Sequence, residues 1–218
     1  MARGLARPIA AEFVGTALLL AAVVGSGIMA ERLAGGNAAL ALLCNAIATG
    51  GALYALILMF APYSGAHFNP LVSLAHVVSG DLPARQALPL ALAQIAGAVG
   101  GVWLAHLMFG LALLQISVRG RDSAGEWAGE FVATFGLVLL IETGRRRFAA
   151  SLPAAVGAYI MAAYWFTSST SFANPAVTLA RSLSDTFAGI APSHAPAFLA
   201  AQLLGAVAAL LLHRWLER

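Results

Sequence analysis

Residues 64–70 read Ser-Gly-Ala-His-Phe-Asn-Pro, and residues 171–175 read Ser-Phe-Ala-Asn-Pro. An Asn before a Pro favours the start of a helix, because the Asn side chain caps free amide hydrogens and proline suits the first helical turn. The apolar segment after each pair is roughly ten residues long, which is about 15 Å or half of a bilayer. Neither segment can span a membrane alone. We therefore predict two re-entrant loops, each starting a half-helix near the midplane.

The composition of the chain is that of a membrane protein. The 218 residues are 61% hydrophobic and 10% charged, well below the roughly 25% charged residues of a soluble domain. At about 20 apolar residues per crossing there is room for about six spans. We predict spanning helices over residues 8–30, 38–60, 86–112, 126–146, 149–168 and 194–216. The predicted fold class is an all-α membrane protein with six transmembrane helices and two re-entrant half-helices.

The arginines are divided unequally between the two sides of this arrangement. One side carries Arg3, Arg7, Arg85, Arg145, Arg146, Arg147, Arg214 and Arg218, and the other carries Arg32, Arg119, Arg121 and Arg181. The richer side normally faces the cytoplasm, so we predict that both termini are cytoplasmic. A single cysteine excludes a disulfide framework. The absence of lysine argues against a nucleic-acid partner. We expect no cofactor and no metal site, because the histidines lack partners at ligand spacing.

The two halves of the chain repeat one another. Residues 12–16 read Glu-Phe-Val-Gly-Thr and residues 130–134 read Glu-Phe-Val-Ala-Thr, and an Ala-Gln-x-x-Gly-Ala pattern occurs at 93–98 and again at 201–206. We place the first repeat at about 8–112 and the second at about 126–216, within one channel domain over residues 1–218. Three helices per half is an odd number, so the second half must be inverted. Inverted repeats with broken helices are typical of transport proteins.

The predicted midplane offers hydrogen-bond donors flanked by acceptors. Asn69 and Asn174 each present a side-chain amide there, and the positive ends of both half-helices face the centre. The carbonyl groups of the loops have no helical partner and must line a wet cavity; we assign this role to Gly65, Ala66, His67, Phe172 and Ala173. Such a centre repels cations and suits small uncharged polar solutes.

These motifs, together with Ala-Glu-Phe-Val-Gly-Thr at 11–16, resemble the major intrinsic protein family, the aquaporins and aquaglyceroporins. The resemblance implies a homotetramer with one pore in each subunit, and a channel rather than an enzyme. It implies that the pore boxes are Asn69, Pro70, Leu71, Asn174, Pro175 and Ala176. Leu71 departs from the usual Asn-Pro-Ala box, which leaves the Asn69 donor intact but crowds its surroundings.

The family's narrowest ring lies outside the asparagine pair. Counted from the two asparagines, the four positions of this ring fall on Thr49, Ala162, Ser171 and Val177. Nearly all of the family has arginine at the last position, and water and glycerol channels have an aromatic residue at the first. The loss of a guanidinium removes fixed charge, donors and bulk. We therefore expect a wider filter that repels cations less.

A wide, neutral filter suits a compact polyhydroxy solute such as arsenous acid, antimonous acid, glycerol or urea. The extended second box, residues 168–192, is similar to that of the bacterial aquaglyceroporins of arsenic-resistance operons. This resemblance implies arsenite flux, directed outward down its gradient. The alternatives are a general facilitator of glycerol, water and urea, or an ion-coupled secondary carrier. A carrier coupled to an ion would need a charged group at its substrate site, and neither Asn-Pro loop contains a carboxylate.

Several further side chains allow two interpretations. Arg181 lies one turn beyond Val177 and could charge an outer vestibule or extend to the lipid interface. Glu12 and Glu130 could relay protons, but the resemblance favours hydrogen bonds that brace the loops. Cys44 is expected to be an apolar filler. His67 is expected to order the first loop or line the vestibule, with pH gating as the alternative.

Overall fold

The computed structural model describes residues 4–218, so Arg3 lies outside the described residues. Six helices are long and apolar enough to cross a membrane, as the sequence predicted. They are α1 (Ala6–Leu33), α2 (Ala38–Ser64), α4 (Ala84–Met108), α5 (Ala124–Arg147), α6 (Leu152–Phe166, preceded by the short 3-10 helix Ala149–Ser151) and α8 (Ala195–Leu216). The third span ends at Met108 rather than at residue 112, because the chain turns at Gly110, where φ is +66°.

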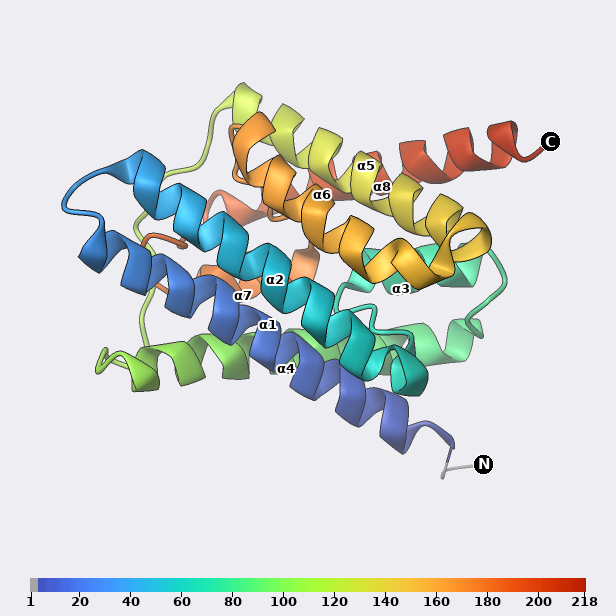
Figure 1. The fold of residues 1–218 in the computed structure, drawn as a ribbon, viewed down its shortest axis with the longest axis horizontal. Helices are drawn as coiled ribbons and strands as arrows, with labels where there is room; N and C mark the ends of the chain where they lie inside the picture. Colours follow the sequence, from blue (N-terminus) through green and yellow to red (C-terminus); the bar gives the residue numbers. More distant parts are fainter. Residues whose placement is uncertain (1–3) are drawn as a thin grey trace.

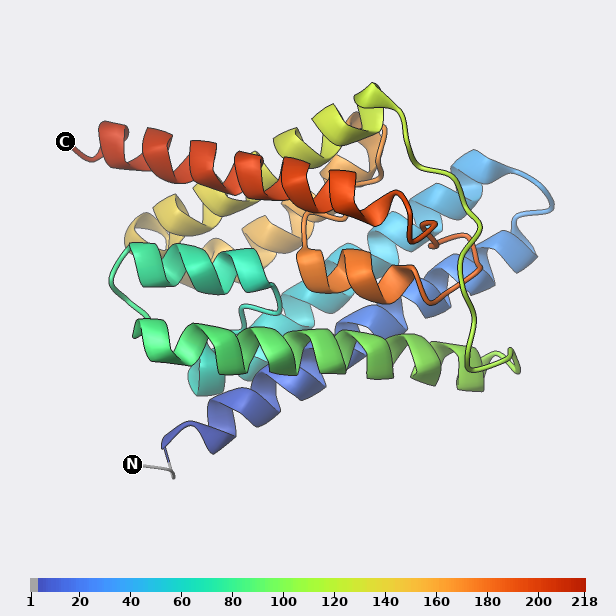
Figure 2. The ribbon, with the colours of Figure 1, turned by 180° about the vertical axis from the view of Figure 1, so that it is seen from behind.

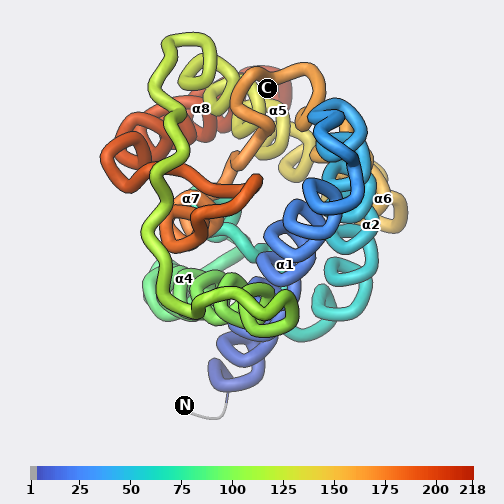
Figure 3. The backbone as a smooth tube through the Cα atoms, turned by 90° about the vertical axis from the view of Figure 1, so that its left-hand side faces the viewer, coloured from blue at the N-terminus to red at the C-terminus, as the bar shows by residue number. Residues whose placement is uncertain are grey.

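Two short helices complete the fold and lie inside it. Helices α3 (Pro70–Val78) and α7 (Pro175–Arg181) have nine and seven residues, so together they extend about 24 Å along one line. Figure 2 shows them nearly end to end, between α8 and α4. Along the long axis of the molecule, α7 again lies between α4 and α8 (Figure 3). The two half-helices thus act as a seventh, broken helix.

Both ends of the described chain lie at the same end of the molecule (Figure 1). We call this the terminal end, and the end that carries the loops 34–37, 109–123 and 182–194 the loop end. Helix α3 belongs to the terminal end and α7 to the loop end. The corresponding helices of the two halves are therefore inverted, as the odd number of spans predicted.

Glycines set the closest helix contacts, and they do so at equivalent places in the two halves. A Cβ atom built on Gly97 of α4 would lie 2.2 Å from the Phe13 carbonyl oxygen of α1, and one on Gly205 of α8 would lie 2.4 Å from the Phe131 carbonyl oxygen of α5. Both contacts are with backbone, which cannot move aside as a flexible side chain can. The Gly of the repeated Ala-Gln-x-x-Gly-Ala pattern is therefore the contact point of each helix pair.

Replacing Gly97 with Ala should destabilise the protein, since the added methyl group must push α1 away from α4. Overpacking of this kind costs about 1–3 kcal/mol, and we expect a lower midpoint of thermal unfolding in detergent. Gly100→Ala is the matched control, because a Cβ at Gly100 meets nothing within 4 Å and alanine is the better helix former. Equal midpoints for the two variants would contradict the proposed contact.

Candidate functional site

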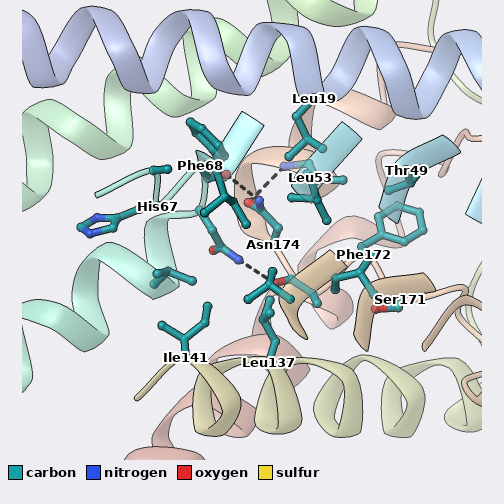
Figure 4. Close-up of a pocket in the computed structure, with 18 of the residues that line it drawn as sticks. Leu19, Thr49, Leu53, His67, Phe68, Leu137, Ile141, Ser171, Phe172 and Asn174 are labelled. Carbon is teal, nitrogen blue, oxygen red and sulfur yellow. Dashed lines mark hydrogen bonds between the residues drawn. The ribbon is translucent and has the colours of Figure 1, made fainter. Parts of the chain in front are cut away.

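Asn69 and Asn174 meet at the centre of the molecule and hold the two half-helices together. Each side-chain oxygen caps its own helix and accepts a backbone N–H, at 3.0 Å for Asn69 and 2.9 Å for Asn174. Each side-chain amide also donates to the opposite loop, from Asn69 to the Ala173 carbonyl at 2.8 Å and from Asn174 to the Phe68 carbonyl at 2.7 Å (Figure 4). An amide group carries two hydrogens. One N–H of each asparagine is therefore left without an acceptor among residues 4–218.

The backbone before each asparagine follows the same unusual path in both loops. The φ angle is positive at Ala66 (52°) and Phe68 (49°), and again at Ser171 (51°) and Ala173 (49°). These residues lie three and one positions before each asparagine. A left-handed conformation costs a residue other than glycine about 1–3 kcal/mol. The inverted repeat thus extends to strained backbone that the rest of the protein must stabilise.

Most carbonyl groups along this path have no hydrogen-bond partner among the described residues. The carbonyl oxygens of Gly65, Ala66, His67 and Phe172 accept no hydrogen bond from the described residues, whereas the Ala173 carbonyl accepts from Asn69. All five of these residues line the central cavity. Backbone acceptors left free inside a membrane protein need water or a polar solute.

Two fully buried carboxylates, Glu12 on α1 and Glu130 on α5, support the strained loops. Glu12 accepts the two backbone N–H groups directly before Asn69, at 2.9 and 2.6 Å. Glu130 accepts the two directly before Asn174, both at 2.8 Å. Neither carboxylate lines the cavity. The geometry is that of a brace for the loops rather than of a proton relay along the solute path.

A glutamine of each half connects its carboxylate to the neighbouring half-helix. Gln94 donates to Glu12 at 2.7 Å and to the Ser73 hydroxyl of α3 at 2.9 Å. Gln202 donates to Glu130 at 2.6 Å and to the Thr178 hydroxyl of α7 at 2.8 Å. These are the glutamines of the repeated sequence pattern, and their function is to fix both the carboxylate and the half-helix.

A cavity of about 190 Å³ runs past this junction. Its polar and charged lining side chains are Thr49, His67, Asn69, His76, Arg145, Tyr164, Ser171, Asn174 and Arg181. No carboxylate lines it among the described residues. In Figure 4, His67 lies on one side of Asn174, and Thr49, Phe172 and Ser171 lie on the other. The cavity therefore offers donors and free carbonyls to a solute, and its charged lining is positive.

Comparison with known proteins identifies the family to which this arrangement belongs. Residues 2–170 match the family described as Major intrinsic protein. The chain belongs to the major intrinsic protein family. Major intrinsic proteins are passive channels and not enzymes, which agrees with a cavity built around a broken helix.

Relatives within the family support the same assignment. The chain is 54% identical to the aquaglyceroporin AqpS of Rhizobium meliloti (strain 1021) over 212 residues, which cover 97% of this chain and 91% of that protein. It is 34% identical to aquaporin Z of Brucella melitensis biotype 1 over 119 residues, 54% of this chain and 47% of that one. The X-ray structure of the aquaglyceroporin from Plasmodium falciparum has the same fold, with a TM-score of 0.71 at 21% identity over 95% of this chain and 94% of that chain.

Three of the four filter positions inferred from the family lie together, and one does not. Thr49, Ser171 and Val177 line the cavity, but Ala162 is exposed on the outer side of α6. The inference for Ala162 is wrong, because it rested on a fixed count from Asn174. At about 100° per residue, the cavity face of α6 carries Val156, Ile160 and Tyr164, and Ala162 lies about 200° from Ile160.

Tyr164, two residues beyond Ala162 on α6, lines the cavity next to Thr49. Its hydroxyl lies 3.3 Å from the Thr49 hydroxyl, and its side chain is buried at the cavity wall. The sequence signal was the spacing of four between Val156, Ile160 and Tyr164, which marks one helical face. An aromatic residue therefore lines the cavity beside Thr49, although it is not at the first filter position.

The corrected ring leads to a pair of contrasting variants. Tyr164→Ala should widen the ring and raise the flux of bulky polyols by at least about twofold, because pore diameter limits such solutes. Ala162→Leu should leave the same flux within about twofold of the native value, since a side chain on the outer face does not enter the pore. Flux is measured by light scattering of proteoliposomes. A large loss of polyol flux in Ala162→Leu, with no change of flux in Tyr164→Ala, would show that Ala162 and not Tyr164 belongs to the ring.

The remaining residues of the boxes lie beside the cavity rather than in its wall. Pro70 and Pro175 occupy the first positions of their helices. Leu71 packs in a cluster with Val138 and Ala206, away from the cavity, and Ala176 is fully buried in the main core. The larger side chain at position 71 is thus accommodated by neighbouring helices and does not narrow the solute path.

Apart from His67 and Arg181, the sequence did not identify the charged and titratable groups near the two ends of the cavity. At the terminal end, His67 and His76 have ring centres 4.3 Å apart, and Arg145 bridges Glu142 and Asp81. Arg145 and Glu142 are distant in sequence from His67, His76 and Asp81, so no local motif joins the two groups. Cys44 is exposed, and no group of three metal-binding side chains occurs in residues 4–218.

At the loop end, Arg121 extends from the loop 109–123 into the protein and is 7% exposed. It donates to the carbonyls of Ser169 and Gly189, both at 2.9 Å. Burial, and secondarily repulsion from Arg119, lowers the pKa of Arg121 to about 10. The side chain therefore remains a cation at neutral pH.

Proposed function

We propose that this protein is a passive channel for small neutral hydroxylated solutes, that arsenous acid is its main solute, and that it serves arsenic efflux. The observation that carries the proposal is Val177, which lines the cavity at the position where nearly all of the family has arginine. Valine occupies less space than arginine and leaves room for a solute larger than water. Free N–H groups of the asparagines and free loop carbonyls can bind the hydroxyl groups of such a solute as it passes.

The charges along the cavity favour neutral solutes over cations. Its lining side chains include Arg145, which is paired with Asp81 and Glu142, and Arg181, which forms no ion pair within the described residues; no carboxylate lines the cavity there. An ion-coupled carrier would need an acidic ligand for its coupling cation at this site. A downhill pore would release arsenite formed inside the cell without consuming energy.

A second candidate is a general facilitator of glycerol, urea and water. Apolar side chains form much of the cavity wall, including Leu19, Leu53, Ile57 and Leu137, and a path with one apolar side suits the carbon backbone of a polyol. The relative from Rhizobium meliloti is named an aquaglyceroporin. The two candidates differ in which solute crosses fastest.

We further propose a homotetramer in a bacterial inner membrane with both termini in the cytoplasm. The support for this orientation is the arginine distribution. The terminal end carries Arg7, Arg85, Arg145, Arg146, Arg147, Arg214 and Arg218, and the loop end carries Arg32, Arg119, Arg121 and Arg181. The end richer in arginine faces the cytoplasm in most membrane proteins.

Flux through purified protein tests the proposal. Proteoliposomes are mixed with gradients of arsenous acid, glycerol, urea or sucrose, and the rate of volume change is followed by stopped-flow light scattering. A channel gives a rate proportional to the gradient, with arsenous acid fastest, whereas a carrier saturates and shows counterflow. Glycerol faster than arsenous acid would favour the facilitator, and saturable flux would reject a channel.

A further inference from the structure

Arg181 is the last residue of α7. Its charged side chain is almost completely buried and is held by two contacts. It is 2% exposed and lines the cavity. Its Nε donates to the Ala188 carbonyl, and its Cζ lies 3.4 Å from the centre of the Phe172 ring. The two terminal nitrogens find no acceptor among residues 4–218. The guanidinium is therefore held by its inner atoms, and its terminal N–H groups remain free at the cavity.

No carboxylate neutralises this charge. Within the described residues neither Arg181 nor Arg121 forms an ion pair with an acid. Arg121 reaches the same Phe172 ring, with its Cζ 5.0 Å from the ring centre, but it does not line the cavity. Two cations thus share one aromatic ring at the loop end, and only Arg181 faces the solute path. Cation–aromatic contact is one of the few ways to stabilise a guanidinium without an acid.

A second unpaired polar group lines the same cavity as this cation. Ser171 is 3% exposed, lines the cavity, and its hydroxyl has no hydrogen-bond partner in the described structure. It directly precedes Phe172, which holds Arg181. Buried hydroxyl groups are normally paired, so a free hydroxyl and free guanidinium N–H groups in the lining of one cavity point to a solute that completes both.

We propose that Arg181 is the specificity-determining residue of this channel: it replaces the filter arginine absent at position 177, repels cations, and together with Ser171 binds an oxygen atom of the passing solute. The proposal rests on the channel function proposed above and adds how that channel remains closed to cations. Arg181 lies four residues after Val177, which is just over one helical turn or about 6 Å along the axis. The positive charge is retained, but the arginine side chain does not narrow the ring formed by Thr49, Tyr164, Ser171 and Val177.

This arrangement changes the expectation that a filter without arginine repels cations less. A guanidinium displaced by one turn still acts on any ion that enters, because charges in a low-dielectric wall act over several ångströms. A neutral hydroxylated solute pays no such electrostatic cost and can accept a hydrogen bond from the free N–H groups. Width and cation exclusion, which one arginine couples in most of the family, would be separated in this chain.

The test compares proton and sodium leak with glycerol flux in proteoliposomes. Arg181→Gln should raise the ratio of cation leak to glycerol flux by at least about tenfold. Arg119→Gln is the matched control, because Arg119 is exposed at the same end and does not line the cavity. Arg119→Gln should keep the native leak. A native leak in Arg181→Gln, with normal assembly, would overturn the proposal.

Two further variants keep the test decisive if Arg181→Gln folds poorly. Arg181→Lys retains the charge and should remain impermeable to cations. The double variant Val177→Arg with Arg181→Gln moves the charge back by one turn and should restore cation exclusion; a leak in both variants would reject the proposal. If the native protein itself passes no neutral solute, the channel function has failed, whereas native solute flux without a leak in Arg181→Gln rejects only the role of Arg181.

Discussion

Val177→Arg is expected to lower the flux of arsenous acid and glycerol by at least about tenfold, which corresponds to a barrier increase of about 1.4 kcal/mol. Val177 is 6% exposed and lines a cavity of only about 190 Å³, so an arginine side chain must occupy space that the solute needs. The new guanidinium would also lie one turn from Arg181. Two cations at this distance would raise the barrier for any residual cation. Water flux should fall less than solute flux, because water needs a narrower passage.

A second variant separates the effect of side-chain size on solute flux from the effect of charge. Val177→Met adds length without charge or donors, and we expect a smaller reduction in glycerol flux than in Val177→Arg. The measurement is stopped-flow light scattering of proteoliposomes that contain equal amounts of each variant. Unchanged arsenous acid flux in Val177→Arg would show that position 177 is not part of the narrowest ring, and would remove the main support for a wide filter.

The fold could be predicted from sequence because its decisive features are local and occur twice. An Asn-Pro pair before a segment too short to span marks each half-helix, and the repeated Glu and Gln positions mark equivalent helices. In the structure, the repeated Glu and Gln residues together hold the two re-entrant loops in place. Glu12 and Glu130 accept the strained loop amides, and Gln94 and Gln202 position the two carboxylates.

The parts of the site that could not be predicted depend on the distance between segments rather than on local pattern. The count that gave Ala162 assumed a loop of constant length before Asn174, and an offset of two residues turns a helix position to the opposite face. The contact of Arg121 with Phe172 joins the loop 109–123 to the second re-entrant loop, and no spacing rule connects them. The burial of Arg181 depends on the Ala188 carbonyl and the Phe172 ring, which a helix-face argument does not include.

The largest loss of stability is expected for Glu130→Gln. Glu130 accepts the backbone N–H groups of Phe172 and Ala173 and the side-chain amide of Gln202. Glutamine keeps one acceptor oxygen and replaces the other with an NH₂ group. Each Glu130 oxygen accepts at least one N–H group, so in either orientation of the glutamine at least one of these buried N–H donors faces the NH₂ group and loses its acceptor. Each buried donor left without a partner costs about 1–3 kcal/mol.

This loss should also stop solute flux, because the same bonds hold Ser171 and Ala173 in their left-handed conformations. Without them the loop can relax, and its free carbonyls would rotate away from the cavity. We expect a lower midpoint of thermal unfolding and a glycerol flux near the background of empty liposomes. Glu31→Gln, at an exposed position at the loop end of α1, removes the same charge and should change neither quantity. If Glu130→Gln kept native stability and native flux, the carboxylate would not brace the loop, and the strained backbone would need another source of stabilisation.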